Sequence, residues 1–362
     1  MTLEIVKICL KYVSYFFIVY MLFYSTFLFI SSIIGSITLF KNRYKEVMHN
    51  NIEHDYYVPV SILIPAYNEE KVIKSSVKSL LSLDYKLYEI IVINDGSTDD
   101  TLDCLIEEYS LVKVEKPYNR QLKTKRIRGI YEGEQRGIKI TVVDKENGGK
   151  SDSLNAGINI SKFPYFLAMD ADSALQKDSL ELLVRPILED ETVIACGGFI
   201  RLSNAVELRD GVVTRYELPK NLLASMQVLE YDRSFLASRI MLDYFNGNLI
   251  ISGAFGLFQK EIVLACNGYD QNTVGEDFEL VSKMHVFCQK NSIEYNIRYI
   301  PEAVCWTQAP EKLRDLIKQR KRWYIGLVQC MAKYRELFCN YHYGFLSFIS
   351  YFYYLFFELI SP

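Results

Sequence analysis

The stretch that decides the fold is residues 60–69, which read VSILIPAYNE. Its first five residues form a mostly apolar run ended by Pro65, which is typical of a short buried strand. Residues 70–83 then place apolar side chains at the three- and four-residue spacing of an amphipathic helix. The stretch therefore predicts a strand, a polar turn and a helix in succession.

The same alternation continues along the middle of the chain. The patterns predict strands over residues 89–93, 111–115, 138–143 and 165–169, and helices over residues 98–109 and 151–160. Because the strands are apolar throughout and alternate with helices, we expect a mostly parallel sheet covered by helices. In such sheets ligands bind at the carboxyl ends of the strands, so the residues after each strand are the candidates for chemistry.

Polar and small residues follow these strands. They are Tyr67-Asn68-Glu69, Asn94-Asp95-Gly96-Ser97, Asn147-Gly148-Gly149-Lys150 and Asp170-Ala171-Asp172. Taken alone, each has a simpler explanation, such as a turn with a helix cap, or a chance D-x-D in a chain with 44 acidic residues. Gathered at one sheet edge, they predict a nucleotide pocket in which two carboxylates share a divalent cation that bridges a diphosphate.

The composition excludes several other classes of protein. The chain has 41 Lys and Arg against 44 Asp and Glu, a net charge of −3, which gives no electrostatic reason to expect nucleic acid as a partner. Half of its residues are hydrophobic, too many for a disordered chain. The eight cysteines form no C-x-x-C pair and the four histidines are dispersed, which favours reduced thiols in a cytosol-facing protein over a disulfide framework or zinc site.

Two apolar stretches indicate a membrane. Residues 13–40 carry no charge, and as a helix they would span about 42 Å, more than the bilayer core requires and longer than a signal peptide. Three basic residues follow this stretch and two precede it, so the positive-inside rule places the catalytic portion in the cytoplasm. Residues 337–357, also without full charges, predict a membrane segment or interfacial hairpin, with a buried core helix as the alternative.

Five motifs in order resemble those of family 2 glycosyltransferases with the GT-A fold. They are Ile64-Pro65-Ala66-Tyr67-Asn68-Glu69, Asn94-Asp95-Gly96-Ser97, Asp170-Ala171-Asp172, Gly275-Glu276-Asp277 and Gln319-Arg320-Lys321-Arg322-Trp323. The last matches the Q-x-x-R-W signature of membrane-integrated cellulose, hyaluronan and poly-N-acetylglucosamine synthases. The usual T-E-D of cellulose synthases is Gly275-Glu276-Asp277 here, which leaves the sugar and acceptor open.

The resemblance implies an α/β fold, a Rossmann-like nucleotide-diphospho-sugar transferase (GT-A) domain flanked by transmembrane and amphipathic interface helices. We expect a membrane anchor over residues 1–45, the cytosolic GT-A domain over 55–309, interface helices over 310–340, and the start of a C-terminal membrane segment, truncated at the chain end, over 341–362. The implied activity is that of an inverting hexosyltransferase that moves a sugar from a nucleotide-diphosphate sugar, expected to be a UDP-sugar, to a growing β-linked polysaccharide at the cell membrane.

The resemblance also assigns roles to residues. Asp277 is the expected catalytic base, although by residue type alone Glu276 and Asp277 could simply cap a helix. Asp170 and Asp172 are the expected ligands of Mg²⁺ or Mn²⁺. The expected donor-binding residues are Ala66, Tyr67, Glu69, Asp95, Lys150, Asp170, Ala171, Asp172, Gln319 and Arg322, and the expected acceptor-binding residues are Ser252, Gly253, Glu276 and Trp323.

Other functions stay open at this point. A nucleotidyltransferase shares the sheet and D-x-D but has no use for the Q-x-x-R-W motif, and a non-catalytic membrane subunit has no need to keep Asp172, Asp277 and Arg322 together. Among transferases, single-sugar transfer to a lipid or lipid-linked acceptor is the alternative to chain elongation. The expected partners are a sugar nucleotide, a glycan or lipid-linked acceptor, the membrane, and an oligomer or partner subunit that completes a channel, but no nucleic acid.

Overall fold

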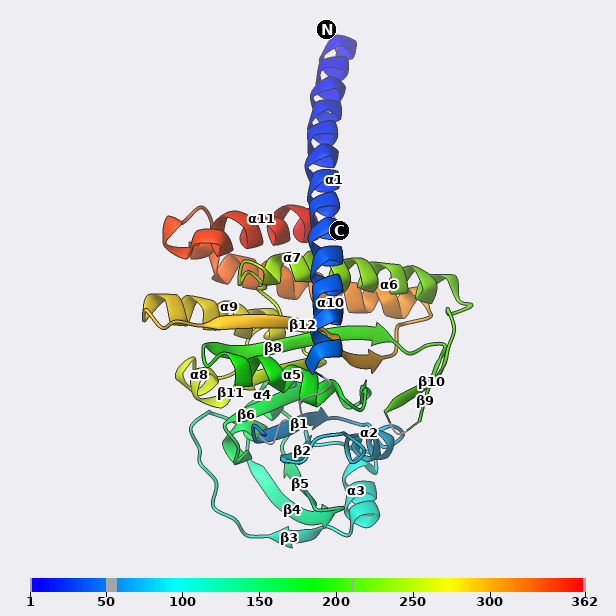
Figure 1. The fold of residues 1–362 in the computed structure, drawn as a ribbon, viewed down its shortest axis with the longest axis vertical. Coiled ribbons are helices and arrows are strands. Elements are labelled where there is room, and N and C mark those ends of the chain that lie inside the picture. The colour runs from blue at the N-terminus through cyan, green and yellow to red at the C-terminus, as the bar shows by residue number, and fades with distance from the viewer. Residues whose placement is uncertain (1, 50–56, 210, 361–362) are drawn as a thin grey trace.

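The computed structural model describes residues 2–49, 57–209 and 211–360, and a single large sheet organises its centre (Figure 1). Over these residues the sheet has ten strands in the order β3-β4-β5-β2-β1-β6-β11-β8-β12-β7. The strands are β1 (Val60–Ala66), β2 (Tyr88–Asn94), β3 (Val112–Val114), β4 (Ile127–Gln135), β5 (Ile138–Lys145), β6 (Tyr165–Met169), β7 (Ala174–Leu175), β8 (Val193–Leu202), β11 (Phe255–Gln259) and β12 (Asn296–Thr307). A separate hairpin joins β9 (Val206–Arg209) to β10 (Val212–Tyr216).

The centre of the sheet is parallel, as predicted. Strands β5, β2, β1 and β6 all run in the same direction, and Ala66, Asn94 and Asp144 are register partners at their carboxyl ends. Strand β11 is antiparallel and pairs Phe255 with Met169, so the loop before β11 reaches the same edge. Antiparallel pairs of β3, β4 and β5 complete the opposite flank. The sheet topology therefore gathers five chain segments at one edge.

Helices cover both faces of the sheet and bury an apolar core on each. They are α2 (Ile73–Leu80), α3 (Thr101–Tyr109), α4 (Lys150–Ile160), α5 (Ser179–Glu189), α6 (Leu222–Arg233), α7 (Arg239–Asp243), α8 (Lys260–Ala265), α9 (Glu276–Lys290) and α10 (Leu313–Lys333). Helix α2 shows the predicted spacing, because Ile73, Val77 and Leu80 are fully buried in the first core. Ile91 and Val143 belong to the second core, on the face covered by α4 and α9. Strands enclosed in this way need apolar residues at successive positions.

Strands β1 and β4 differ from the prediction. Strand β1 does not stop at Pro65 but continues to Ala66. The backbone N–H of Val60 points toward β2, and successive residues of a strand point alternately to either side, so the backbone nitrogen of Pro65 points toward β6. The pairing of β6 with β1 ends before that, at Leu63. The missing N–H of proline therefore costs no ladder bond there. Strand β4 was not predicted, because its alternating charged and small residues carry little apolar signal.

Helix α1 (Thr2–His49) projects away from the sheet (Figure 1). Its residues Glu4–Asn42 form the one helical stretch, among the described residues, that is long and apolar enough to cross a membrane. The C-terminal aromatic segment, Leu346–Leu359, lies crosswise to α1, and the Phe357 ring lies 5.1 Å from that of Tyr24. At 14 residues it is shorter than the roughly 20 residues that a span needs. A membrane segment beginning within residues 341–362, like the other domain limits, stays a prediction.

Candidate active site

Two loops at the carboxyl edge of the sheet are bound to each other. The loop after β1 contains Asn68 in the left-handed backbone conformation (φ 58°), and its side-chain oxygen accepts a hydrogen bond from the Thr98 backbone N–H at 2.8 Å. The Glu69 N–H donates to the Thr101 hydroxyl at 2.8 Å. Tyr67, which precedes Asn68, is half exposed. The first two predicted motifs therefore form one surface, with the Tyr67 ring available to a ligand.

A buried ion cluster fixes the floor beneath these loops. The Lys145 ammonium is fully buried and pairs with Asp95 and, at 2.7 Å, with Asp152. The Asp95 carboxylate also accepts hydrogen bonds from the backbone N–H groups of Gly148 at 2.9 Å and Gly149 at 2.7 Å. Both Asp95 oxygens are thus engaged within the protein, so its expected donor contact stays a prediction. Sequence reasoning missed Lys145, because no local signal distinguishes it from an exposed lysine at the end of a strand.

Lys150, the first residue of α4, joins two of the predicted motifs. Its ammonium lies 2.6 Å from an Asp170 oxygen and 3.1 Å from a Glu276 oxygen, and it donates to the Gly253 carbonyl at 3.2 Å. Burial alone would lower the pKa of Lys150, but Asp170 and Glu276 raise it well above its ordinary value. One permanently charged ammonium therefore connects the D-x-D segment, the loop before β11 and the first turn of α9.

Asp277 lies beside this ammonium in the first turn of α9. Its carboxylate accepts a hydrogen bond from the Gly253 N–H at 3.2 Å. Burial and the adjacent Glu276 charge raise the pKa of Asp277, with Lys150 opposing them. For Glu276 itself, burial raises the pKa, but the Lys150 charge, hydrogen bonds and the Arg322 charge together hold it below the ordinary value. The two neighbouring carboxylates are thus differentiated, and Asp277 is the stronger base.

Glu69, Asp170 and Asp172 are close enough to influence one another's charge, although among the described residues no group of three acidic, Cys or His side chains converges as a metal site. Loss of hydration and then the Asp170 charge raise the pKa of Asp172. The pKa of Glu69 is raised by burial, followed by Asp172 and Asp170. Lys150 offsets part of this repulsion by its pair with Asp170, and a hard divalent cation would relieve more of it. Magnesium sites commonly use one or two carboxylates plus substrate phosphates, and Asp170 and Asp172 fit that pattern.

The remaining predicted residues differ in their placement. Ala66 and Ala171 are buried backbone positions at the strand ends. Ser252 accepts, through its backbone oxygen, a hydrogen bond from Phe255 that closes the turn before β11. The Gln319 side-chain oxygen is buried without a hydrogen-bond partner among the described residues. Arg322 is close enough to Glu276 for its charge to lower the pKa of that carboxyl.

The last residue of the Q-x-x-R-W motif contacts α6 instead of the carboxylates. The Trp323 ring is 6.5 Å from the Tyr231 ring and is covered by the Arg320 guanidinium at 4.5 Å. Arg320 in turn forms a bidentate pair with Glu230 at 2.5 and 2.7 Å. Trp323 keeps 40% of its surface exposed, so its ring is open to a further ligand.

The glycine that replaces the threonine of T-E-D has a packing reason. A Cβ atom on Gly275 would lie 3.0 Å from the Cα atom of Gly326 in α10. Conversely, a Cβ atom on Gly326 would lie 2.8 Å from the backbone of Gly275. The two backbones therefore cross at a point where side chains do not fit.

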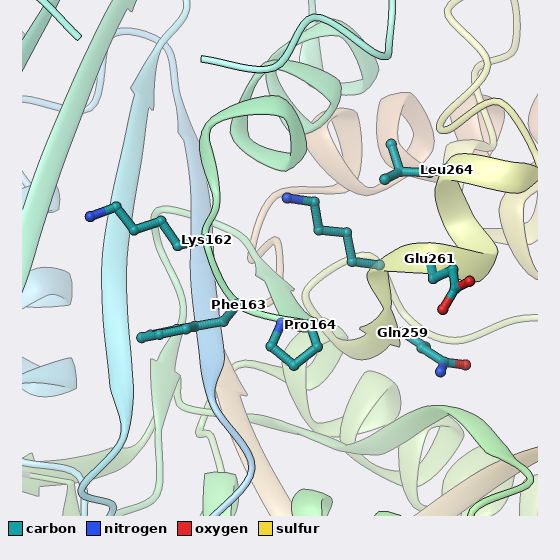
Figure 2. Close-up of a pocket in the computed structure, with 7 residues that line it drawn as sticks. Lys162, Phe163, Pro164, Gln259, Glu261 and Leu264 are labelled. Carbon is teal, nitrogen blue, oxygen red and sulfur yellow. The ribbon is translucent and has the colours of Figure 1, made fainter. Parts of the chain in front are cut away.

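A pocket elsewhere on the molecule is separate from this site. It has a volume of about 330 Å³ and is lined by Lys162, Phe163, Pro164, Gln259, Lys260, Glu261 and Leu264 (Figure 2). These residues lie at the start of β6 and the end of β11, whereas Asp170 follows the end of β6. The pocket is thus at the opposite edge of the sheet, and none of the predicted site residues lines it.

Fold and site together define an α/β enzyme of the glycosyltransferase class. Residues 61–263 match the family model of glycosyl transferase family 2, and the chain belongs to that family. A mannosyltransferase from Pyrobaculum calidifontis, solved in complex with GDP-Man and Mn²⁺, covers 85% of this chain and 76% of its own with a TM-score of 0.56. At 19% identity this likeness concerns the fold alone, and it confirms the predicted α/β GT-A architecture.

Curated relatives are similar over most of the chain. A poly-beta-1,6-N-acetyl-D-glucosamine synthase of Staphylococcus epidermidis is 28% identical over 311 residues, and one of Staphylococcus aureus is 28% identical over 310 residues. Each match covers 85% of this chain and 64% of the relative. The chain therefore spans somewhat less than two thirds of the length of these relatives.

Proposed function

We propose that the protein is an inverting glycosyltransferase that moves a sugar from a nucleoside diphosphate sugar onto a growing β-linked polysaccharide at a membrane. The observation that carries the proposal is the position of Lys150, whose ammonium lies 2.6 Å from Asp170 and 3.1 Å from Glu276. This contact joins the segment with the expected diphosphate carboxylates to the first turn of α9, which carries the expected base, Asp277. Donor activation and acceptor deprotonation require that proximity.

On the donor side, the chain offers an aromatic surface and charges for a diphosphate. Tyr67 presents a half-exposed ring to the nucleoside, above the floor fixed by the Lys145 cluster. Asp170 and Asp172 would hold Mg²⁺ or Mn²⁺, which when bound neutralises the charge that develops on the leaving diphosphate. Lys150 and Arg322 bind phosphate oxygens from the protein side, and the planar Arg322 guanidinium can do so with two parallel hydrogen bonds.

On the acceptor side, Asp277 acts as the general base. Its carboxylate takes the proton of the acceptor hydroxyl while that oxygen attacks the anomeric carbon, and the bond from this carbon to the diphosphate oxygen breaks. Glu276, kept anionic by Lys150, increases the basicity of Asp277. Because attack and departure occur on opposite faces, an α-linked donor gives a β-linked product.

Elongation at a membrane is supported by features outside the carboxylate cluster. Helices α6 and α10 lie crosswise to α1 (Figure 1), and α10 exposes the cations Lys318 and Lys321 beside apolar residues such as Ile317. An amphipathic basic helix of this kind is suited to a membrane surface. The exposed Trp323 ring can stack on successive sugar rings of a growing chain. The names of the relatives make UDP-N-acetylglucosamine the first donor to test.

The test is to incubate membranes containing the full chain with radiolabelled UDP-N-acetylglucosamine, UDP-glucose and GDP-mannose, and to size the product. We expect a polymer from one UDP-sugar, and none from the Asp277→Asn variant. A product with a single added sugar under donor excess would favour the lipid-acceptor alternative. Failure to transfer any of the three sugars, with the protein folded and metal supplied, would contradict the proposal.

A further inference from the structure

The second half of α10, beyond the Q-x-x-R-W motif, contacts the segment that carries Glu276 and Asp277. The contacting residues are Gly326, Gln329, Cys330 and Lys333. Their spacing of three, four and seven residues places them on one face of the helix. This face, which we call the clamp face, lies against residues 270–279.

Gln329 makes the polar contact of the clamp face nearest to the turn before α9. Its side-chain oxygen accepts a hydrogen bond from the backbone N–H of Val274 at 3.0 Å, and the Thr273 hydroxyl lies 3.4 Å away. Val274 precedes Gly275, which has an irregular backbone conformation (φ −102°, ψ 65°) and is the N-cap of α9. Gln329 therefore fixes the chain three residues before Asp277.

The next contact is made between backbones. Gly326 and Gly275 approach so closely that a Cβ atom on either would meet the other at 2.8–3.0 Å. The Cys330 thiol donates to the Gly275 carbonyl at 3.4 Å. These contacts leave α10 little freedom to shift relative to the turn.

Lys333 fixes the segment from both sides of the turn. Its ammonium lies 2.6 Å from Asp270 and 2.6 Å from Glu279. Glu279 is fully buried and also accepts a hydrogen bond from the Tyr334 hydroxyl at 2.7 Å. The segment with Glu276 and Asp277 is thus held to α10 before, at and after the N-terminus of α9.

We propose that Gln329 is a positioning residue for the catalytic base, and that the clamp face aligns Asp277 with the donor site. The proposal rests on the proposed function, because it takes Asp277 as the base. A general base must lie within hydrogen-bond reach of the hydroxyl that it deprotonates. A displacement of about 1 Å can reduce turnover by about 100-fold. Releasing the Val274 N–H from Gln329 is expected to permit such a displacement.

The experiment measures kcat and donor KM for Gln329→Met and Gln329→Glu. Methionine has a similar length but cannot accept the Val274 hydrogen bond, whereas glutamate keeps an acceptor oxygen at that position. Gln121→Met, at an exposed glutamine remote from α10 in the sequence, is the matched control. We expect kcat to fall about 10-fold or more in Q329M with donor KM within twofold, and Q329E to recover most of the loss.

Amide hydrogen exchange over residues 270–279 provides a readout independent of turnover. Exchange there is expected to rise in Q329M, but not in Q329E or Q121M. Because Gln329 is exposed, Q329M is expected to fold, and its thermal unfolding is recorded alongside. Wild-type kcat in Q329M would overturn the positioning role if Asp277→Asn is inactive. Wild-type turnover in Asp277→Asn would instead overturn the proposed function.

Discussion

Two lysines five residues apart show how the environment of a side chain determines its role. Lys145 is fully buried and pairs with Asp95 and Asp152, so its charge is neutralised within the protein. Lys150 keeps about a third of its side chain exposed between Asp170 and Glu276, at the site where a ligand would arrive. The first therefore stabilises the loops, and the second is suited to binding and catalysis.

The Lys145 cluster leads to a prediction about stability. Lys145→Met leaves Asp95 and Asp152 without their buried counter-charge, a change that typically destabilises a protein by about 3–5 kcal/mol. The control is Lys139→Met, which removes a partly exposed pair with Glu132 and is expected to cost about 1 kcal/mol or less. Urea unfolding of both variants measures the difference. Equal losses would show that the buried cluster has no special role.

The charge of Glu276 predicts a pH dependence. Burial and Glu276 raise the pKa of Asp277, and a base loses activity as the pH falls through its pKa, so the acid limb of kcat should lie above the ordinary aspartate value of about 4. Glu276→Gln removes the negative neighbour and leaves Lys150 to favour the ionised form. The acid limb should therefore move to lower pH. A limb that stays in place or moves upward in the pH–rate profile would argue against Asp277 as the titrating base.

Sequence reasoning predicted site residues from their type and their position after a strand or in a motif. Asp170, Lys150 and Glu276 were predicted from motifs far apart in the chain, and the structure places the Asp170 and Glu276 carboxylates 2.6 and 3.1 Å from the Lys150 ammonium. Lys145 and Gly326 were not found, because their importance arises only from tertiary contacts. A lysine after a strand is ordinarily exposed, and nothing local shows that a glycine in a helix meets another backbone.

At the scale of elements, the parallel centre of the sheet was predictable and its flank was not. Strand β6 has the predicted limits, since its apolar run begins after Pro164 and ends at Asp170. Strand β4 belongs to the antiparallel flank, where half-exposed strands need no continuous apolar run. The crossing of α10 with the start of α9 is likewise set by a long-range contact, Gly275 with Gly326.

That crossing predicts that alanine in place of the helical Gly326 destabilises the protein, the reverse of the usual effect. In an unconstrained helix, replacing glycine by alanine stabilises by about 1 kcal/mol. At Gly326 the new Cβ atom would lie 2.8 Å from the Gly275 backbone, and overpacking of this kind costs about 1–3 kcal/mol. We expect Gly326→Ala to lower both the melting temperature and kcat, whereas Ile325→Ala, at the exposed neighbouring position, should leave kcat unchanged. An increase in melting temperature with normal kcat would show that the crossing tolerates a side chain.

At the scale of the whole molecule, helix α1 and the crosswise helices form a consistent arrangement for a membrane. The residues of α1 from Glu4 to Val19 are exposed, and further along the same helix Phe27 stacks on Tyr353 at 4.9 Å. The basic helix α10 lies on the side of this aromatic segment toward the sheet (Figure 1). A bilayer around the exposed, uncharged part of α1, which begins at Val13, would therefore leave the sheet in water and α10 at its surface.

This arrangement predicts how the protein partitions between membrane and water. Val19→Asp with Phe23→Asp places two acids on the exposed surface of the uncharged stretch, at about 2.5–3.5 kcal/mol each near the centre of a membrane helix. We expect this double variant to leave the membrane fraction on carbonate extraction. Ile5→Asp with Val6→Asp, outside the stretch, should remain with the membrane. Retention of both double variants would contradict a span through residues 13–40.

The central claim is inverting transfer with Asp277 as the base, and the anomeric configuration of the product tests it most directly. Purified enzyme is given an α-linked UDP-sugar, and the new linkage is read by NMR. With one strong base and direct displacement, every new linkage is predicted to be β. An α-linkage would require a second displacement or a different mechanism, and it would contradict the account.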